Sequence, residues 1–177
     1  FSIVSCDNLP SNGKVLRGLL IEFAELREGE VADWIENRVT CPSSMVDRIV
    51  PATTEKDRQN VQKQLGFEDQ GVVVTESFSQ WVLEDNFCAG RPAWEEVGVT
   101  MVDDVTPFEH MKLRMLNGTH STLAYLGFIA GHEFVADAAN DSDFQKLLIG
   151  MWQDEIIPTL SMPMGIDLRA YAHDLMA

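Results

Sequence analysis

The sequence has few of the residues that signal a disulfide framework, a structural zinc site or a membrane segment. Its three cysteines, Cys6, Cys41 and Cys88, form neither a CxxC pair nor a Cys/His cluster of zinc spacing. No run of residues has the apolar continuity of a membrane span, and the amino terminus lacks the charged and apolar regions of a signal peptide. We therefore expect reduced thiols in a cytoplasmic protein.

Several motifs of enzymes and metal sites are also missing. The four histidines do not form HxxxH or HExxH spacing, so we expect no metal site. There is no Gly-x-Ser-x-Gly nucleophile elbow and no P-loop. A Gly-x-Gly-x-x-Gly segment is absent as well, and we expect any dinucleotide-binding half of the protein to lie outside this chain.

Basic residues are scarce, because 13 Lys and Arg stand against 28 Asp and Glu, for a net charge of −15. This balance argues against binding nucleic acid or an anionic membrane through bulk electrostatics. The 177 residues are enough to bury the core of one domain, and no linker is long enough to mark a domain boundary. The chain starts at Phe1 and stops inside a predicted helix, so we expect a piece of a larger protein.

Local patterns predict a mainly helical chain with a few short strands. Apolar spacing predicts helices over residues 14–27, 31–37, 144–157 and 167–175. The polar segment 54–65 is predicted to be a surface helix by a threonine cap, Thr53 or Thr54, and by Gly66 as its stop. β-prone runs predict strands at residues 1–5, 72–76 and 99–102. The first strand ends at Cys6, Asp7 and Asn8, which are candidate site residues because open α/β sheets present ligand groups at the carboxyl ends of strands.

The stretch 107–120 predicts a helix with an unusual content. Thr106 suits the N-cap and Pro107 the first turn. At about 100° per residue, Glu109, Lys112 and His120 fall within roughly a quarter of the circumference, with Asn117 at the edge of that arc. Apolar residues spread over much of the remaining surface, as in a helix buried in a protein interior. A carboxylate, an amine, an amide and an imidazole are therefore expected on one interior face.

Two interpretations of this face remain open from periodicity alone. In the first, the groups form an active site, because desolvation lowers the pKa of a lysine toward the range in which it acts as a base. In the second, Glu109 and Lys112 form a surface pair at i,i+3, the histidine is a satisfied core residue and Arg114 is solvated.

Four stretches of the sequence occur in an order that matches a known family. They are Ser5-Cys6-Asp7-Asn8 with Asn12-Gly13, Ser43-Ser44-Met45-Val46-Asp47-Arg48-Ile49, Gln80-Trp81-Val82 with Glu84-Asp85, and Lys112-Leu113-Arg114-Met115-Leu116-Asn117-Gly118-Thr119-His120. Together they span most of the chain. By these motifs the chain resembles the mannitol dehydrogenase family, the long-chain, metal-independent polyol dehydrogenases.

The resemblance implies a fold for the whole chain. Such proteins join an amino-terminal Rossmann-type domain, which binds the nicotinamide cofactor, to a mostly helical carboxyl-terminal domain. We expect residues 1–177 to be the helical, mainly α substrate and catalytic domain, with residues 1–8 as the last strand of a cofactor domain that is otherwise absent. The isolated chain is then expected to be inactive, because its partner, the amino-terminal Rossmann domain, is missing.

The resemblance also implies roles for individual residues. Lys112 matches the general base that takes a proton from a secondary alcohol while hydride passes to NAD. Asn8 and Asn117 match the amides that hold the oxygen as it becomes alkoxide-like. His120 matches a residue that orients substrate, and Glu109 a carboxylate that passes the proton toward solvent.

The resemblance narrows the substrate to a class. Asp47 matches a substrate-side carboxylate, and Arg48 is one candidate for the cation that a substrate carboxylate would need, alongside Arg114 or a residue outside the sequence. The two pairs that fit are D-mannonate/D-fructuronate and D-mannitol/D-fructose, with a slight preference for the fructuronate reductase branch. NAD and NADP are not separated. The competing class is a non-catalytic helical binding or scaffold domain.

Overall fold

The computed structural model describes residues 1–163 and 165–176. The chain forms two compact units, Phe1–Asp103 and Asp104–Ala177. From the sequence we expect one domain, because no long linker is present. The connection between the units is instead very short, since one strand ends at Val102 and the next helix begins at Thr106. A boundary of this kind leaves no compositional signal.

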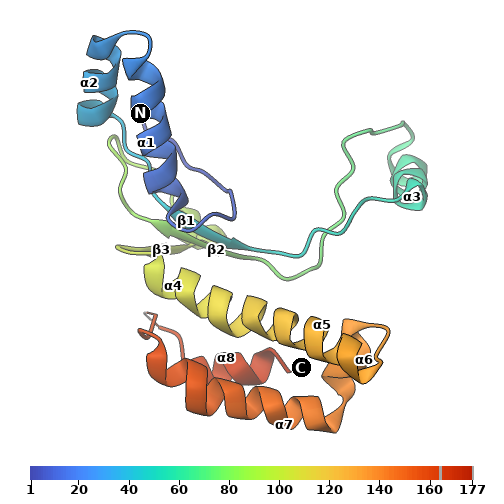
Figure 1. Cartoon of the computed structure of the whole chain (residues 1–177). Helices are drawn as coiled ribbons and strands as arrows, with labels where there is room; N and C mark the ends of the chain where they lie inside the picture. Colours follow the sequence, from blue (N-terminus) through green and yellow to red (C-terminus); the bar gives the residue numbers. More distant parts are fainter. Residues whose placement is uncertain (164, 177) are drawn as a thin grey trace. The chain divides into compact units, whose positions relative to one another are not determined.

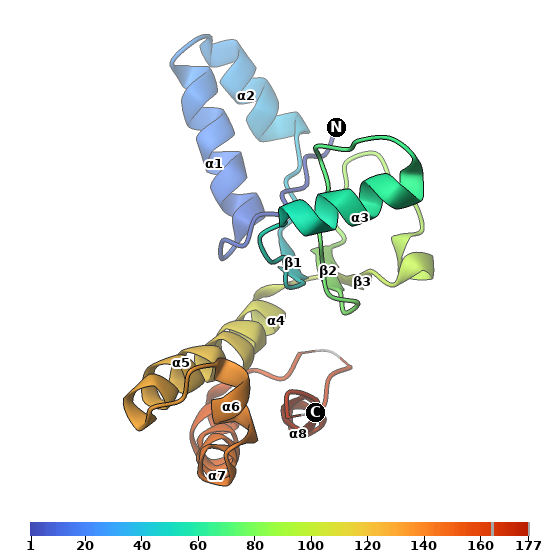
Figure 2. The ribbon, with the colours of Figure 1, turned by 90° about the vertical axis from the view of Figure 1, so that its right-hand side faces the viewer.

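Unit 1 begins with two helices that pack side by side, α1 (Asn12–Glu25) and α2 (Gly29–Arg38) (Figures 1 and 2). Both helices predicted in this region are confirmed within a few residues. The chain enters α1 through Ser11, whose φ of 51° is in the left-handed region. The loop that carries Asn8 therefore turns sharply into α1.

A three-stranded sheet forms the centre of unit 1. Strand β1 (Ser44–Asp47) pairs antiparallel with β2 (Gln80–Glu84), and β2 pairs parallel with β3 (Thr100–Val102), in the order β1-β2-β3. Met45, Val82 and Leu83 are buried in its core. A 3-10 helix, η1 (Trp94–Val97), lies between β2 and β3. The strand predicted at 99–102 is confirmed by β3.

The other two predicted strands are wrong. Residues 1–5 contribute a single bridge, between Ser2 and Thr40, and residues 72–76 run as irregular chain. Residues 72–76 lie on a long excursion between β1 and β2 that also carries the polar helix α3 (Glu55–Leu65) (Figure 2). A β-prone run becomes a strand only where a neighbouring chain offers paired hydrogen bonds, and neither segment has such a neighbour along its length.

Unit 2 is helical and begins with one long helix of three parts. These are α4 (Thr106–Met111), the π-helical turn η2 (Lys112–Asn117) and α5 (Gly118–Ala130) (Figure 1). It continues through α6 (Val135–Asn140), α7 (Ser142–Gly150), the π-helical turn η3 (Met151–Ile156), the 3-10 turn η4 (Ile157–Thr159) and α8 (Leu168–Asp174).

The two π-helical turns of unit 2 contact each other. The core around them is formed by Phe108, Met111, Met115, Leu148 and Trp152, all at most 2% exposed. Every helix within the described residues is too short or too polar to span a bilayer.

Candidate active-site residues in the two units

Asn8 lies on the exposed loop that precedes α1, and a buried side chain ties this loop to the sheet. The Nδ2 group of Asn12, a residue only 2% exposed, donates to the carbonyl oxygens of Asp7 at 2.8 Å and Ser44 at 2.9 Å. Its Oδ1 accepts the Ser44 amide N–H at 2.9 Å. In addition, the Ser44 hydroxyl donates to the Ser5 carbonyl. Asn12 and Ser44 thereby join the Asn8 loop to the first residue of β1.

The start of α1 also makes a very close approach to the chain that leads into β1. A Cβ atom on Gly13 would lie 2.3 Å from the Cys41 carbonyl oxygen and 2.6 Å from the Ser43 amide nitrogen. Both are backbone atoms, so no rotamer change can relieve the clash. The motif Asn12-Gly13 is therefore the means by which the Asn8 loop is held against the sheet of unit 1.

The two proposed substrate residues follow at the end of β1. Asp47 is half-buried and lies opposite Gln80 in the antiparallel register. Arg48 is exposed, and its Nε donates to the Phe78 carbonyl at 2.9 Å. Asn8, Asp47 and Arg48 thus belong to one unit and are connected through Asn12 and β1.

We expect Asn12→Ala to lower the free energy of unfolding by roughly 2–3 kcal/mol, because it leaves the buried Ser44 N–H and C=O without the Asn12 side chain and removes the tie to the Asp7 carbonyl. Urea unfolding of the protein measures the loss. Asn37→Ala is a suitable control, because its Nδ2 makes one exposed hydrogen bond, to the Asp33 carbonyl. Equal stability of the two variants would contradict the role of Asn12.

The residues of the central helix divide into an interior set and an exposed one. Glu109 and Lys112 are each only 7% exposed. This burial matches the first interpretation of the helix and is incompatible with a surface ion pair. Asn117 is half-buried, whereas His120 is exposed. The expectation of His120 on the same interior face is therefore not met.

The π-helical turn explains the position of Asn117. The Gly118 amide N–H donates to the Leu113 carbonyl, five residues earlier, so the turn contains an additional residue. On an α-helix Lys112 and Asn117 would lie about 140° apart. In the π turn the residue five positions later lies closer to one full turn from the first, which brings Asn117 toward the face of Lys112. The exposure of His120 does not follow from this turn, because the extra residue would also bring His120 closer to the face of Lys112.

A buried hydrogen-bonded pair follows the π turn, and sequence reasoning missed it. The Trp152 indole Nε1–H donates to the Thr119 hydroxyl at 2.9 Å, and that hydroxyl donates to the Met115 carbonyl at 2.5 Å. Trp152 is on η3 and Met115 on η2, so the pair joins the two π turns. Thr119 belongs to the motif at residues 112–120. In the sequence, however, Trp152 is only one apolar residue of the helix predicted over 144–157.

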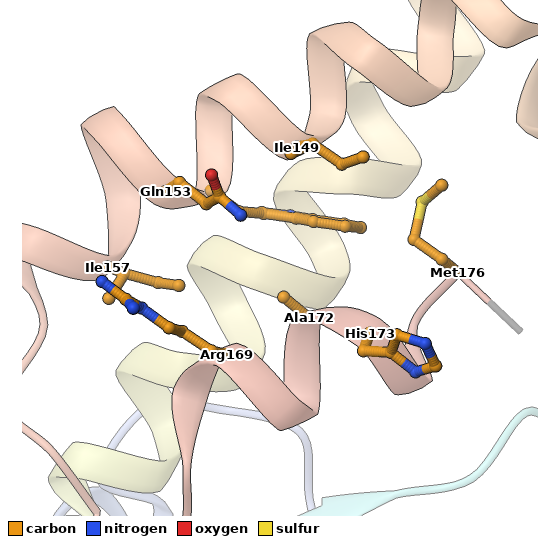
Figure 3. A pocket seen from close by; sticks show the side chains of 8 residues that line it. Ile149, Gln153, Ile157, Arg169, Ala172, His173 and Met176 are labelled. Atoms are coloured by element: carbon orange, nitrogen blue, oxygen red, sulfur yellow. The ribbon is translucent and has the colours of Figure 1, made fainter.

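A cavity of about 300 Å³ opens between η3 and α8. Its lining is mostly apolar and includes Ile149, Trp152, Ile157 and Ala172. Figure 3 shows Gln153, Ile157 and Arg169 toward one end of it and His173 and Met176 toward the other. None of the predicted site residues lines this cavity.

The thiols are placed apart from one another. All three cysteines are free, with Cys41 buried and the other two exposed. Burial raises the pKa of the Cys41 thiol, an effect that Arg17 partly offsets. Among the residues that the structure describes, no cluster of His, Cys, Asp and Glu has the arrangement of a metal site.

Comparison with known proteins assigns both units to one family. The family model of the mannitol dehydrogenase Rossmann domain matches residues 1–96. The model of the mannitol dehydrogenase C-terminal domain matches residues 104–177. The chain belongs to the mannitol dehydrogenase family. The boundary between the two matches coincides with the break between the two units.

These matches correct the predicted fold class. The chain is mostly helical with a small sheet, but residues 1–96 match the Rossmann domain, so the prediction that this domain is absent is wrong. The Gly-x-Gly-x-x-Gly segment is one turn of such a domain, and its absence does not exclude the remaining elements. The same finding removes the grounds for naming the amino-terminal Rossmann domain as a missing partner and for expecting an inactive chain.

Named relatives and solved structures of the family are similar along nearly the whole chain. D-mannonate oxidoreductase of Escherichia coli (strain K12) is 49% identical over 97% of the chain and 35% of the relative. A crystal structure of a substrate-free D-sorbitol dehydrogenase is 41% identical with a TM-score of 0.91, over 99% of this chain and 36% of that one. Mannitol 2-dehydrogenase of Pseudomonas fluorescens, in a complex with NAD and D-mannitol, is 46% identical with a TM-score of 0.81 over the same shares. The chain thus spans about a third of the length of these relatives.

Proposed function

We propose that this chain is the catalytic and substrate-binding part of an NAD-dependent oxidoreductase. Its reaction interconverts a secondary alcohol and a ketone on a six-carbon polyol or sugar acid, without a metal. The observation that carries the proposal is the burial of Lys112 and Glu109 at the start of the π turn, in a chain of the mannitol dehydrogenase family. The NAD and D-mannitol complex of a 46% identical protein supports the cofactor and substrate class.

Lys112 acts in this proposal as the general base. The amine takes the proton from the substrate hydroxyl as the carbon–hydrogen bond breaks. NAD, when bound, supplies the hydride acceptor. Lys112 is only 7% exposed, so its amine is shielded from bulk water. Glu109, three residues earlier and equally buried, then accepts the proton and passes it toward solvent.

Asn117 and Asn8 supply the stabilisation that a metal gives in other alcohol dehydrogenases. Each amide N–H₂ donates to the substrate oxygen as negative charge develops on it. The π turn supports this role for Asn117, because it turns the amide toward the face of Lys112. Asn12 and Gly13 support it for Asn8, because they hold the preceding loop against β1. His120 orients the substrate from the exposed side of the helix.

The substrate's far end is assigned to the residues at the end of β1. The Asp47 carboxylate accepts hydrogen bonds from substrate hydroxyl groups. The Arg48 guanidinium is exposed and its Nε donates to the Phe78 carbonyl, and its two terminal nitrogens suit a substrate carboxylate. D-mannonate/D-fructuronate and D-mannitol/D-fructose both fit this chemistry. Relatives named for each pair are similar to the chain at 49% and 46% identity.

We expect Asn117→Ala to lower kcat by about 10²–10³-fold, because it removes one donor to the developing oxyanion. Asn8→Ala should have a similar effect. Steady-state kinetics on the full-length protein measure both. Asn140→Ala is the matched control, because the Asn140 side chain lies at an exposed position of α6 and donates to the Ala136 carbonyl of its own helix. A normal kcat in both Asn8 and Asn117 variants would contradict the proposed oxygen-holding pair.

One assay tests the proposed function directly. The full-length protein is given NADH with D-fructose and with D-fructuronate side by side, and NADPH is tried in parallel. Oxidation of NADH with either ketone supports the proposal, and the ratio of the two kcat/KM values identifies the substrate pair. Absence of turnover with both ketones and both cofactors would favour the alternative, a non-catalytic helical binding domain.

A further inference from the structure

The π turn that carries Lys112 and Asn117 is unlike the helix on either side of it, so something must hold it. In an α-helix each carbonyl accepts the amide N–H four residues later. In a π turn the carbonyl accepts the amide N–H five residues later. The residues Lys112–Asn117 themselves are ordinary helix formers or nearly so. The stabilising contacts therefore come from outside the turn.

The best-placed contact is the buried pair of Thr119 and Trp152. The Thr119 hydroxyl donates to the Met115 carbonyl, which lies inside the π turn. Back-bonding of this kind, to the carbonyl four residues earlier, bends helices and offers that carbonyl an alternative to its α-helical partner. The hydroxyl rotor is in turn fixed, because its oxygen accepts the Trp152 indole N–H at 2.9 Å.

Burial makes this pair a strong constraint. Thr119 is 5% exposed, Trp152 1% and Met115 0%. The indole N–H has no water as a substitute partner at such depth, so breaking the pair leaves this buried donor unsatisfied. The Met115 carbonyl, which also accepts the Gly118 N–H, loses one of its two donors. Trp152 belongs to η3, the second π turn, whose C-cap Ile157 donates its N–H to the Trp152 carbonyl five residues earlier. The two irregular turns thus meet at one hydrogen-bonded side-chain pair.

We infer that Thr119 and Trp152 are positioning residues, which hold the π turn and so keep Asn117 on the same side of the helix as Lys112. This inference rests on the proposed roles of Lys112 and Asn117. If the pair is broken, the segment can relax toward an α-helix, on which Asn117 lies about 140° from Lys112. Substrate binding to residues of unit 1 does not require the Thr119–Trp152 pair. The chemical step requires it, because that step depends on the position of Asn117.

The test is a set of side-chain substitutions in the full-length protein. Thr119→Val removes the hydroxyl at nearly constant volume, Thr119→Ser keeps it, and Trp152→Phe removes the indole N–H. Thr122→Val is the matched control, because the Thr122 hydroxyl also donates to the carbonyl four residues earlier, that of Gly118, at 2.9 Å. Thr122 lies beyond the π turn, in α5.

We expect Thr119→Val to lower kcat by about 10–100-fold with little change in the KM for NAD, since misplacing one group by about 1 Å can cost this much. The substrate in this assay is D-mannitol or D-mannonate, depending on which of the two the wild-type protein oxidises. Thr119→Ser should restore kcat, Trp152→Phe should lower it, and Thr122→Val should leave it unchanged. Amide hydrogen exchange over residues 113–119 should rise in Thr119→Val and Trp152→Phe but not in Thr122→Val.

The outcomes separate this inference from the proposed function. Normal kcat in Lys112→Ala would contradict the proposed function itself. Normal kcat and exchange in a folded Thr119→Val, with an inactive Lys112→Ala, would contradict only the positioning role. Failure of serine to restore kcat, or an equal loss in Thr122→Val, would also overturn it, because a general effect on stability would then suffice. If Thr119→Val does not fold, the same criteria apply to Trp152→Phe, which retains a large apolar ring in the core.

Discussion

Lys112→Ala in the full-length protein is expected to lower kcat by about 10²–10⁴-fold, the range attributed to a lost general acid or base. The dissociation constant for NADH should change far less. The reason is that the amine acts on the substrate hydroxyl in the transition state and makes no contribution to holding the cofactor in the proposed mechanism. Steady-state kinetics together with a fluorescence titration of NADH measure both quantities.

Lys146→Ala is the control for this substitution. Lys146 lies in the same unit, and its Nζ pairs with the Asp143 carboxylate at 2.9 Å on the exposed face of α7. An exposed pair of this kind contributes little to stability, so this variant should behave as wild type. Equal loss of turnover and of NADH binding in Lys112→Ala would indicate misfolding, and normal turnover would exclude Lys112 as the base.

Gly13→Ala is expected to lower the free energy of unfolding by more than about 4 kcal/mol, an effect that few single substitutions reach. The added Cβ would lie 2.3 Å from the Cys41 carbonyl oxygen and 2.7 Å from the Pro42 carbonyl carbon. Because these atoms are backbone, α1 must move away from the chain that enters β1. The Asn8 loop would move with it. Urea unfolding followed by circular dichroism measures the loss.

Gly18→Ala is the matched control in the same helix. A Cβ at Gly18 meets nothing within 4 Å, and the residue lies inside α1. Alanine has the higher helix propensity, so Gly18→Ala should raise stability by roughly 0.5–1 kcal/mol. The two glycines should therefore give opposite signs. A Gly13→Ala variant as stable as wild type would show that α1 and the 41–43 segment separate easily, and that Gly13 does not fix the loop.

Local sequence patterns predicted the helices of this chain well. The apolar spacing over 14–27 and 31–37 corresponds to α1 and α2, and the run 167–175 to α8. Pro107 stands in the first turn of α4, where its missing N–H is harmless. These features depend on residues three or four apart, so a single sequence is enough to recognise them. The burial of Glu109 and Lys112 was one of two interpretations that periodicity left open, and the structure decides for it.

Strands and unit boundaries were predicted less well, because they depend on distant neighbours. Residues 72–76 have the composition of a strand but no strand beside them, whereas residues 80–84 pair on both sides and form β2. The break at Asp103 carries no linker. The missing glycine motif led to the wrong conclusion about the Rossmann domain, because one short motif was taken to represent a whole domain.

The sequence by itself determined which chemical groups this protein can use: one lysine and one glutamate on a largely apolar helix, an asparagine five residues later, and a second asparagine before α1. It also determined the family, through the order of four motifs. Only the tertiary structure decided on which side of the helix each of these groups lies. The π turn moves Asn117 toward the face of Lys112, and it is joined to η3 by the hydrogen bonds of Thr119 and Trp152. A π turn and an α-helical turn differ little in backbone energy. Contacts with a segment more than thirty residues away therefore decide which of the two forms.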